Sequence, residues 1–375
     1  MTKKELRTEI IESLTKQGFY VNGHVTPSLT NKKHLRKIQG HSRIEQISLQ
    51  KKFLLENHQI IRNHLLNGKD INPEKIELEL RMVEDGTTEQ IMYRWWNLVW
   101  WSVPYQRAYG RQMRFIIWDK THDSPFGLIG LQSPILRMSV RDKYLNIPKE
   151  NLDYVINKSM QAQRLGALPP YNELLGGKMA ALALTSNELR LKYQKKYKGI
   201  ETILQKRVIE AQLLFLTTTS AFGRSSIYNR LKYKDWLVAH SLGYTKGSGT
   251  FHITEELYFE IQKFLQKRNV DINTTFGYGP SRKMKLLDTA FSMLDLQEYH
   301  YHNIQREFFL FPLAKNLNNI IEKGVRPIYF QRALQDLTEF WKERWAIPRS
   351  IRDKSWMDFN AELFLNKNIR SIKRY

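Results

Sequence analysis

The stretch "GALPPYNELLGGKMAALAL", residues 166–184, decides how the middle of the chain folds. A diproline interrupts the chain, a diglycine follows, and Lys178 then begins a run of Ala, Leu and Met that favours a helix. Backbone N–H groups at the start of a helix attract phosphate oxygens, and glycine leaves them open. Gly176, Gly177 and Lys178 are therefore candidate phosphate contacts. The alternative is that the glycines only permit a tight turn into a closely packed helix.

Two familiar nucleotide-binding motifs are excluded here. A P-loop needs a glycine where Asn172 stands and a hydroxyl side chain where Met179 stands. A dinucleotide-binding fingerprint needs a third glycine and a strand–helix–strand frame, and no strand is evident before the diglycine. The stretch suits a phosphate oxygen without indicating which molecule carries it.

Outward from this stretch, the pattern predicts a mixed α/β fold. The apolar runs "MRFIIWD" and "FGLIGLQS" flank the polar turn "KTHDSP" and predict a β-hairpin. By the same reasoning we expect a helix over 148–168, a long helix over 177–199, a strand over 211–221, a short helix over 225–233 and a glycine-rich hairpin over 240–254. Three regions are predicted: a basic helical module (1–90), a sheet core (91–254), and a helical region with a basic tail (255–375).

The composition favours a polyanionic partner. The 375 residues include 59 Lys and Arg against 37 Asp and Glu, a formal net charge of +22. Nucleic acid, DNA or RNA, is the first expectation, and a scaffold for an acidic protein is the alternative. The lack of cysteine excludes disulfides, thiolate zinc sites and cysteine nucleophiles. With no signal-like apolar segment and no run of ~20 apolar residues, we expect a cytoplasmic protein without membrane contact.

Further candidate contacts follow from residue type and position. Arg224 lies in a polar loop after the predicted strand, Arg230 and Lys232 lie on the predicted short helix, and Lys246 lies in a glycine turn. Four tryptophans, Trp95, Trp96, Trp100 and Trp101, would provide either a base-stacking platform or core packing.

No catalytic or metal constellation emerges from the sequence. His300 and His302 fall in a predicted helix, where a spacing of two turns their side chains in different directions. Asp119, His122 and Asp123 fall in the predicted hairpin turn, where Asp commonly bonds the backbone. No metal site is predicted, and a metal-dependent nuclease stays an alternative that would need converging carboxylates.

The order of predicted elements is similar to the core of GNAT-type acyltransferases. That resemblance implies coenzyme A pyrophosphate at the loop before the long helix and a tyrosine general acid at Tyr228. The family pattern Q/R-x-x-G-x-G/A is altered here, with Glu173 at its first position and Lys178 at its last. No cofactor is therefore predicted, and coenzyme A belongs to the acyltransferase alternative.

A broader resemblance covers residues 113–253. The hairpin, the segment through "GALPPYNELLGGKMAALAL" and the ending "TTTSAFGRSSIYNRLKYKDWLVAHSLGYTKGSG" resemble the core of the DruA family, most specifically at Gly243–Gly247. Members of that family are components of Druantia, a multi-gene bacterial anti-phage defence system, or occur in mobile elements. The resemblance implies an antiviral role together with other Druantia proteins, including a large helicase.

Overall fold

A seven-stranded sheet forms the centre of the molecule. The computed structural model describes residues 1–100, 103, 108–202, 205–273 and 281–374. The strand order is β10-β11-β7-β6-β5-β4-β3. Its strands are β3 (Leu78–Met82), β4 (Gln112–Asp119), β5 (Ser124–Gln132), β6 (Ser159–Ala167), β7 (Phe215–Thr219), β10 (His240–Tyr244) and β11 (Glu307–Pro312). The chain is 46% helical and 18% strand, so the predicted mixed α/β class is confirmed.

Among these strands one neighbouring pair is parallel. β6 pairs with β7 in parallel, from Ser159 opposite Phe215 to Ala162 opposite Thr218. The pairs from β3 to β6, and those of β11 with β7 and β10, are antiparallel. The predicted hairpin is confirmed as β4 and β5, and every residue of β5 is buried. Both faces of the sheet are therefore covered.

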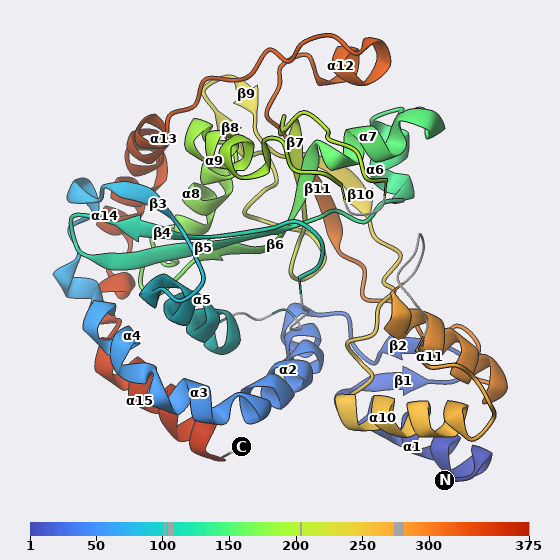
Figure 1. Cartoon of the computed structure of the whole chain (residues 1–375). Helices are drawn as coiled ribbons and strands as arrows, with labels where there is room; N and C mark the ends of the chain where they lie inside the picture. Colours follow the sequence, from blue (N-terminus) through green and yellow to red (C-terminus); the bar gives the residue numbers. More distant parts are fainter. Residues whose placement is uncertain (101–102, 104–107, 203–204, 274–280, 375) are drawn as a thin grey trace.

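Helices cover the two faces separately (Figure 1). One face carries α8 (Gly176–Ala183), α9 (Asn187–Tyr197) and α13 (Leu334–Trp341). The other carries α5 (Thr88–Val99), beneath which α3 (Lys51–Glu56), α4 (His58–His64) and α15 (Ala361–Arg374) form an outer arc. The shorter helices α6 (Ser139–Tyr144), α7 (Leu152–Asn157), α12 (Leu317–Lys323) and α14 (Ile347–Arg352) lie around the sheet.

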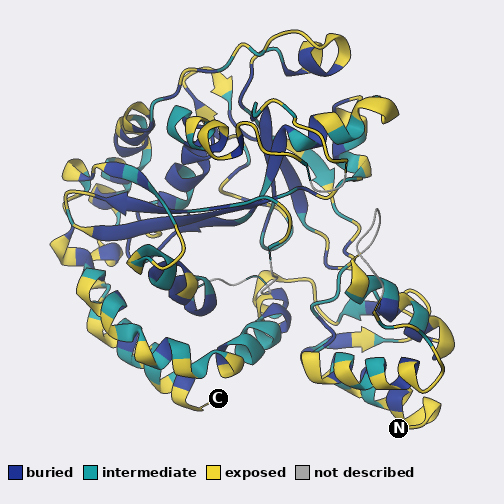
Figure 2. Cartoon of the chain, in the orientation of Figure 1, coloured by how far each residue is buried: buried dark blue, intermediate teal, exposed yellow. Residues whose placement is uncertain are grey.

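A smaller unit combines the N-terminal segment of the chain with two helices between residues 255 and 293. The hairpin β1 (Phe19–Val21) and β2 (Val25–Pro27) lies with α1 (Lys3–Gln17), α10 (Glu255–Gln266) and α11 (Arg282–Met293), and α2 (Lys32–Leu49) leads from this unit to the sheet. Its apolar cluster is separate from those that surround the sheet. Figure 2 marks buried residues both in this unit and in the sheet. Residues that are more than 200 positions apart in the sequence thus share one core. The predicted region boundaries at residues 90 and 254 stay a prediction.

The largest departure from the sequence-based expectation is β6. Residues 148–168 were expected to form one helix, but α7 ends at Asn157 and the chain continues as β6. The strand is fixed between β5 and β7, so its pairing on both edges overrides the helix propensity of its Gln, Met and Arg residues.

Other expected elements also differ. The long helix over 177–199 is divided into α8 and α9, because Ser186 caps α9 by accepting the N–H of Leu189. The expected short helix over 225–233 is a turn followed by β8 (Lys232–Tyr233), which pairs with β9 (Trp236–Leu237). β10 pairs with β11 rather than within a local glycine-rich hairpin. The regions expected to be helical also contain β1, β2, β3 and β11.

Within the described ranges, no helix combines the length and the apolarity that crossing a bilayer requires.

Two buried histidines predict an acid-sensitive smaller unit. Burial lowers the pKa of His252 to about 4, and burial and then the neighbouring His252 lower the pKa of His302. Unfolded histidine has a pKa of about 6.5, so the unfolded chain binds more protons below that pH. We expect stability to fall as the pH drops below about 6.5, by about 1.4 kcal/mol at pH 5.5 for His252, with a further loss in the same direction from His302. Hydrogen exchange of α10 and α11 peptides measures this loss.

Substitution of one histidine tests the assignment. His302→Gln, whose amide oxygen can still accept the N–H of Ile304, should remove about half of the pH dependence. His24→Gln, at an exposed position of the same unit, should leave the pH dependence of stability unchanged. An unaltered pH dependence in His302→Gln would contradict this interpretation.

Candidate nucleic-acid interface

The diglycine that begins α8 is tightly packed. The N–H of Gly176 donates to the carbonyl of Tyr171 at 3.0 Å, so this donor is already used within the chain. A Cβ at Gly176 would lie 2.6 Å from the same carbonyl oxygen and 2.7 Å from the Cβ of Ala167. Close packing therefore accounts for this glycine, whereas a Cβ at Gly177 would meet only the end of the Ile227 side chain, at 3.1 Å.

Lys178 is held against its surroundings. Its Nζ donates to the carbonyl of Ile227 at 3.3 Å and lies 5.3 Å from the centre of the Trp345 ring. Burial lowers the pKa of this lysine. Phosphate contact at Gly176, Gly177 and Lys178 stays a prediction.

Two predicted residues, Arg224 and Lys246, meet at the start of β11. Gly223 forms a parallel bridge with Arg306 on one side. On the other side, the N–H of Thr245 donates to the carbonyl of Arg306 at 2.9 Å. The adjacent Arg224 and Lys246 are both exposed. Segments after β7 and β10 thus converge on Arg306, the residue before β11.

A second arginine lies close to Arg306. Arg164 of β6 is 4% exposed, and its guanidinium donates to the side-chain oxygen of Asn97 and, at 2.9 Å, to the carbonyl of Gln163. Burial, and then the positive charge of Arg164, lower the pKa of Arg306 to about 10. We call Arg164, Arg224, Lys246 and Arg306 the junction cluster.

The acidic residue nearest in sequence does not neutralise Arg306. Glu307 is buried, and its carboxylate accepts hydrogen bonds from the N–H of Ser225 at 2.9 Å, the amide of Asn229 at 3.0 Å and the hydroxyl of Ser241 at 2.7 Å. Because successive side chains of a strand point to opposite faces, Glu307 lies on the other side of the sheet from Arg306. Nε of Arg306 is buried and has no hydrogen-bond partner among the residues that the structure describes.

α2 lies beside the junction cluster and extends its charge. The amide of Gln39 donates to the carbonyl of Ala221 at 3.5 Å, and the guanidinium of Arg36 lies 5.4 Å from the centre of the Phe222 ring. Along the same half of α2, four basic side chains are exposed: Lys32, Lys33, Arg36 and Lys37.

The remaining predicted contacts lie elsewhere. Arg230 is exposed in the turn before β8, with a φ of 59°, and Lys232 is exposed on β8. Tyr228 is 6% exposed, and its ring lies edge-on to Phe309 and Phe311, so it is placed in the core. Burial raises the pKa of its hydroxyl.

The predicted tryptophan quartet is mainly interior. Trp95 and Trp96 are fully buried, and Trp95 Nε1 donates to the carbonyl of Leu54 at 3.2 Å. Trp100 is partly buried against Gly166, whereas Trp101 lies outside the described residues. Core packing accounts for Trp95 and Trp96.

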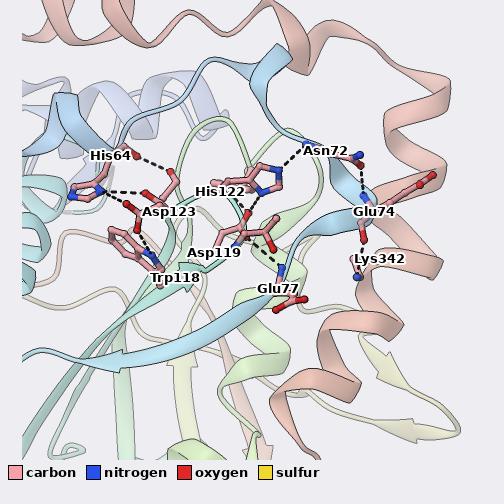
Figure 3. Close-up of polar contacts among 12 residues, drawn as sticks. His64, Asn72, Glu74, Glu77, Trp118, Asp119, His122, Asp123 and Lys342 are labelled. Carbon is pink, nitrogen blue, oxygen red and sulfur yellow. Dashed lines mark hydrogen bonds and ion pairs between the residues drawn. The ribbon is translucent and has the colours of Figure 1, made fainter.

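The hairpin turn holds a buried Asp–His contact (Figure 3). Asp119 is fully buried, and its carboxylate contacts Nδ1 of His122 at 2.6 Å and the hydroxyl of Tyr171 at 2.9 Å. The N–H groups of Thr121 and Glu77 also donate to it. Since Nε2 of His122 accepts the N–H of Asn72 at 3.0 Å, this imidazole links two loops. Both of its nitrogens are engaged, so the pair is suited to stabilising the fold.

Metal-binding geometry is lacking in the described part of the chain, where no group of three His, Cys, Asp or Glu could hold an ion. His300 contacts Asp288 at 3.0 Å, and His302 accepts the N–H of Ile304 at 3.1 Å. Neither lies in a helix, contrary to the sequence-based expectation.

Sequence reasoning missed Arg164 and Arg306. Arg164 was placed in a helix and Arg306 in a different helical region, so nothing indicated that they meet. A basic residue within or directly before an apolar strand could have indicated both arginines. This pattern is visible only once β6 and β11 are recognised as strands.

The packing of the diglycine can be tested directly. Gly176→Ala should destabilise the protein by about 2 kcal/mol, because the clash with a backbone oxygen outweighs the gain in helix propensity. Gly177→Ala should be neutral or slightly stabilising, because the end of the Ile227 side chain can move. Chemical denaturation measures both. Equal stability of the two variants would contradict the packing explanation.

The Asp119 contact gives a second prediction. The carboxylate of Asp119 accepts hydrogen bonds from four donors, and Asp119→Asn replaces it by a neutral amide. We expect the free energy of unfolding to fall by about 3 kcal/mol. The matched Asp123→Asn, in an exposed position of the same turn, should change it by less than about 0.5 kcal/mol. Thermal and urea unfolding would show the difference, and similar losses in both variants would refute it.

Comparisons with known proteins agree with the resemblance seen in the sequence. The family model described as "Druantia protein DruA" matches residues 29–323. The chain is also 32% identical over 370 residues to the Druantia protein DruA of Escherichia coli (strain UMEA 4076-1), covering 96% of this chain and 91% of that protein. No solved structure matches the chain. On the strength of the family match and of this full-length similarity, the chain belongs to the DruA family.

Proposed function

We propose that this protein contributes to Druantia anti-phage defence by binding the phosphate backbone of nucleic acid at the junction cluster. Its place in a Druantia system follows from family membership, as expected from the sequence, and so do partners among the other Dru proteins. The binding itself, a large helicase as partner and a cytoplasmic location belong to the proposal.

The observation that carries the proposal is the pair Arg164 and Arg306. Arg164 is buried and Arg306 is partly buried, and they lie near enough for the charge of Arg164 to depress the pKa of Arg306. Such like charges repel each other more strongly than they would in bulk water. A phosphate between them would relieve the repulsion and accept charge-assisted hydrogen bonds from guanidinium groups.

The surroundings extend this site to the surface. Arg224 and Lys246 are exposed beside Arg306, and the basic half of α2 continues outward from Phe222. Exposed basic residues of this kind attract a polyanion through the release of its counterions. A single phosphate ion would need only the junction cluster, whereas the exposed basic residues of α2 lengthen the site. A site of this length favours a nucleic-acid chain as the ligand.

The acidic-scaffold, acyltransferase and nuclease alternatives have weaker support. Coenzyme A would have to use the start of α8, where the N–H of Gly176 is already bonded and Lys178 is held by Ile227. No second function is therefore proposed, and the lack of a cofactor stays a prediction.

Salt dependence tests the proposal. The double variant Arg224→Gln/Lys246→Gln should bind a single-stranded or duplex oligonucleotide about tenfold more weakly at low salt. The slope of log affinity against log salt should fall by about 2, since each lost phosphate contact removes about 0.9. Fluorescence anisotropy over a salt series measures both quantities.

A variant with the same charge change provides the control. Lys195→Gln/Lys198→Gln removes two exposed lysines at the end of α9, and should leave the slope nearly unchanged. Equal effects of the two double variants would show attraction by net charge alone. An unchanged slope in Arg224→Gln/Lys246→Gln would overturn the site.

A further inference from the structure

A pocket lies at the other end of β11 from the junction cluster. Its volume is about 400 Å³, and residues of α6, the β8–β9 hairpin and α12 line it together with Leu310 and Pro312 of β11. Figure 1 labels these elements. β11 runs from Glu307 to Pro312. At a rise of about 3.3 Å per residue, the two ends of this strand are roughly 17–20 Å apart. The pocket is therefore separate from the junction cluster.

The rim of the pocket carries exposed aromatic rings. Trp236 is 52% exposed and Tyr144 is 51% exposed, and both line the pocket. Phe330, which is buried, lies edge-on to Trp236 with ring centres 5.1 Å apart. Large aromatic side chains left in water around a concave site are typical of a surface that stacks on a flat ligand.

A buried positive charge stands behind this wall. The guanidinium of Arg332 lies 4.1 Å from the centre of the Phe330 ring. Arg332 is 1% exposed, and its Nη1 and Nη2 have no hydrogen-bond partner among the described residues. Burial lowers its pKa to about 10, which keeps it charged at neutral pH. Arg332 is not part of the pocket lining, so it contributes a positive charge behind Phe330 rather than a contact with a ligand.

Polar groups also line the pocket. Lys315, Asn318 and Asn319 line the pocket and are exposed, and Nζ of Lys315 lies 5.8 Å from the centre of the Phe330 ring. Asn316 is committed to the fold, because its side chain bonds the backbone of Arg326 and Ile328. Carboxamides both donate and accept hydrogen bonds, as the edge of a nucleobase requires, and an ammonium group suits a phosphate.

We propose that this pocket binds a nucleotide, with the base against Trp236 and Tyr144 and the phosphate at Lys315. The pocket is of the size usual for small-ligand sites. An apolar peptide would leave Lys315 and the two asparagines without partners, whereas a nucleotide engages the rings, the amides and the charge together. The nucleotide is either free or part of a single strand. This assignment is independent of phosphate binding at the junction cluster.

Titration of the full-length protein with adenosine and uridine 5′-monophosphates and the matching nucleosides tests the pocket. Isothermal calorimetry should show binding of a monophosphate that is tighter than that of its nucleoside. Trp236→Ala should weaken binding of the monophosphate about 5- to 150-fold, as expected for the loss of one stacking partner. Lys315→Gln should abolish the preference for monophosphate over nucleoside while retaining nucleoside binding. Tyr20→Ala, which removes a 60% exposed ring from the smaller unit, is the matched control and should have no effect.

A single-stranded dodecanucleotide distinguishes the two sources. If the natural ligand is part of a nucleic-acid strand, Trp236→Ala weakens binding of the oligonucleotide as much as binding of the monophosphate. If the natural ligand is a free nucleotide, the substitution weakens only binding of the monophosphate. Either result supports the pocket. Absence of monophosphate binding at millimolar concentration, or equal binding by wild type and Trp236→Ala, overturns it. Loss of oligonucleotide binding in Arg224→Gln/Lys246→Gln alone would support the junction cluster without the pocket, so the two proposals can fail separately.

Discussion

The parallel pairing of β6 with β7 is the constraint on which the rest of the structure depends. Two parallel neighbours cannot be joined by a tight turn, so the chain must cross over one face of the sheet. α8 and α9 make this crossing, and α8 lies directly on β5 and β6. The short distance between helix and sheet leaves no room for a Cβ at Gly176. Gly176, but not Gly177, is thus required by the connection itself, before any ligand is considered.

The same pairing creates the space for the junction cluster. Paired residues of β6 and β7 end at Ala162 and Thr218, while β6 continues alongside β5 alone. Arg164 therefore lies beyond the last paired residue, on an edge that β7 no longer covers. β11 begins on the far side of β7, which brings Arg306 to the same end of the sheet. Two arginines that are remote in sequence meet because the strand between them stops.

Local patterns predicted the elements that local interactions determine. The β4–β5 hairpin and β7 were predicted from apolar runs and turn residues, and Arg224 and Lys246 from loop chemistry. β6 and β11 were not, because β6 contains residues that also suit a helix and β11 pairs with strands that are distant in the sequence. Arg164 and Arg306 could not be found for the same reason. Which side chains a strand brings together depends on register, and register is set by pairing partners.

The tryptophans show that a cluster of aromatic residues in the sequence does not indicate which aromatic rings are exposed to solvent. Trp95 and Trp96 stand together because α5 needs bulk to fill the space between the sheet and the arc of α3, α4 and α15. Trp236 follows the charged residues Lys234 and Asp235, on a two-residue strand too short to bury it, and it is half exposed. A ring that contributes to a core is surrounded by apolar neighbours in sequence, whereas a ring available to a ligand must be supported without being covered. Phe330, backed by Arg332, gives Trp236 that support from one side only, which leaves the rest of its surface to a ligand.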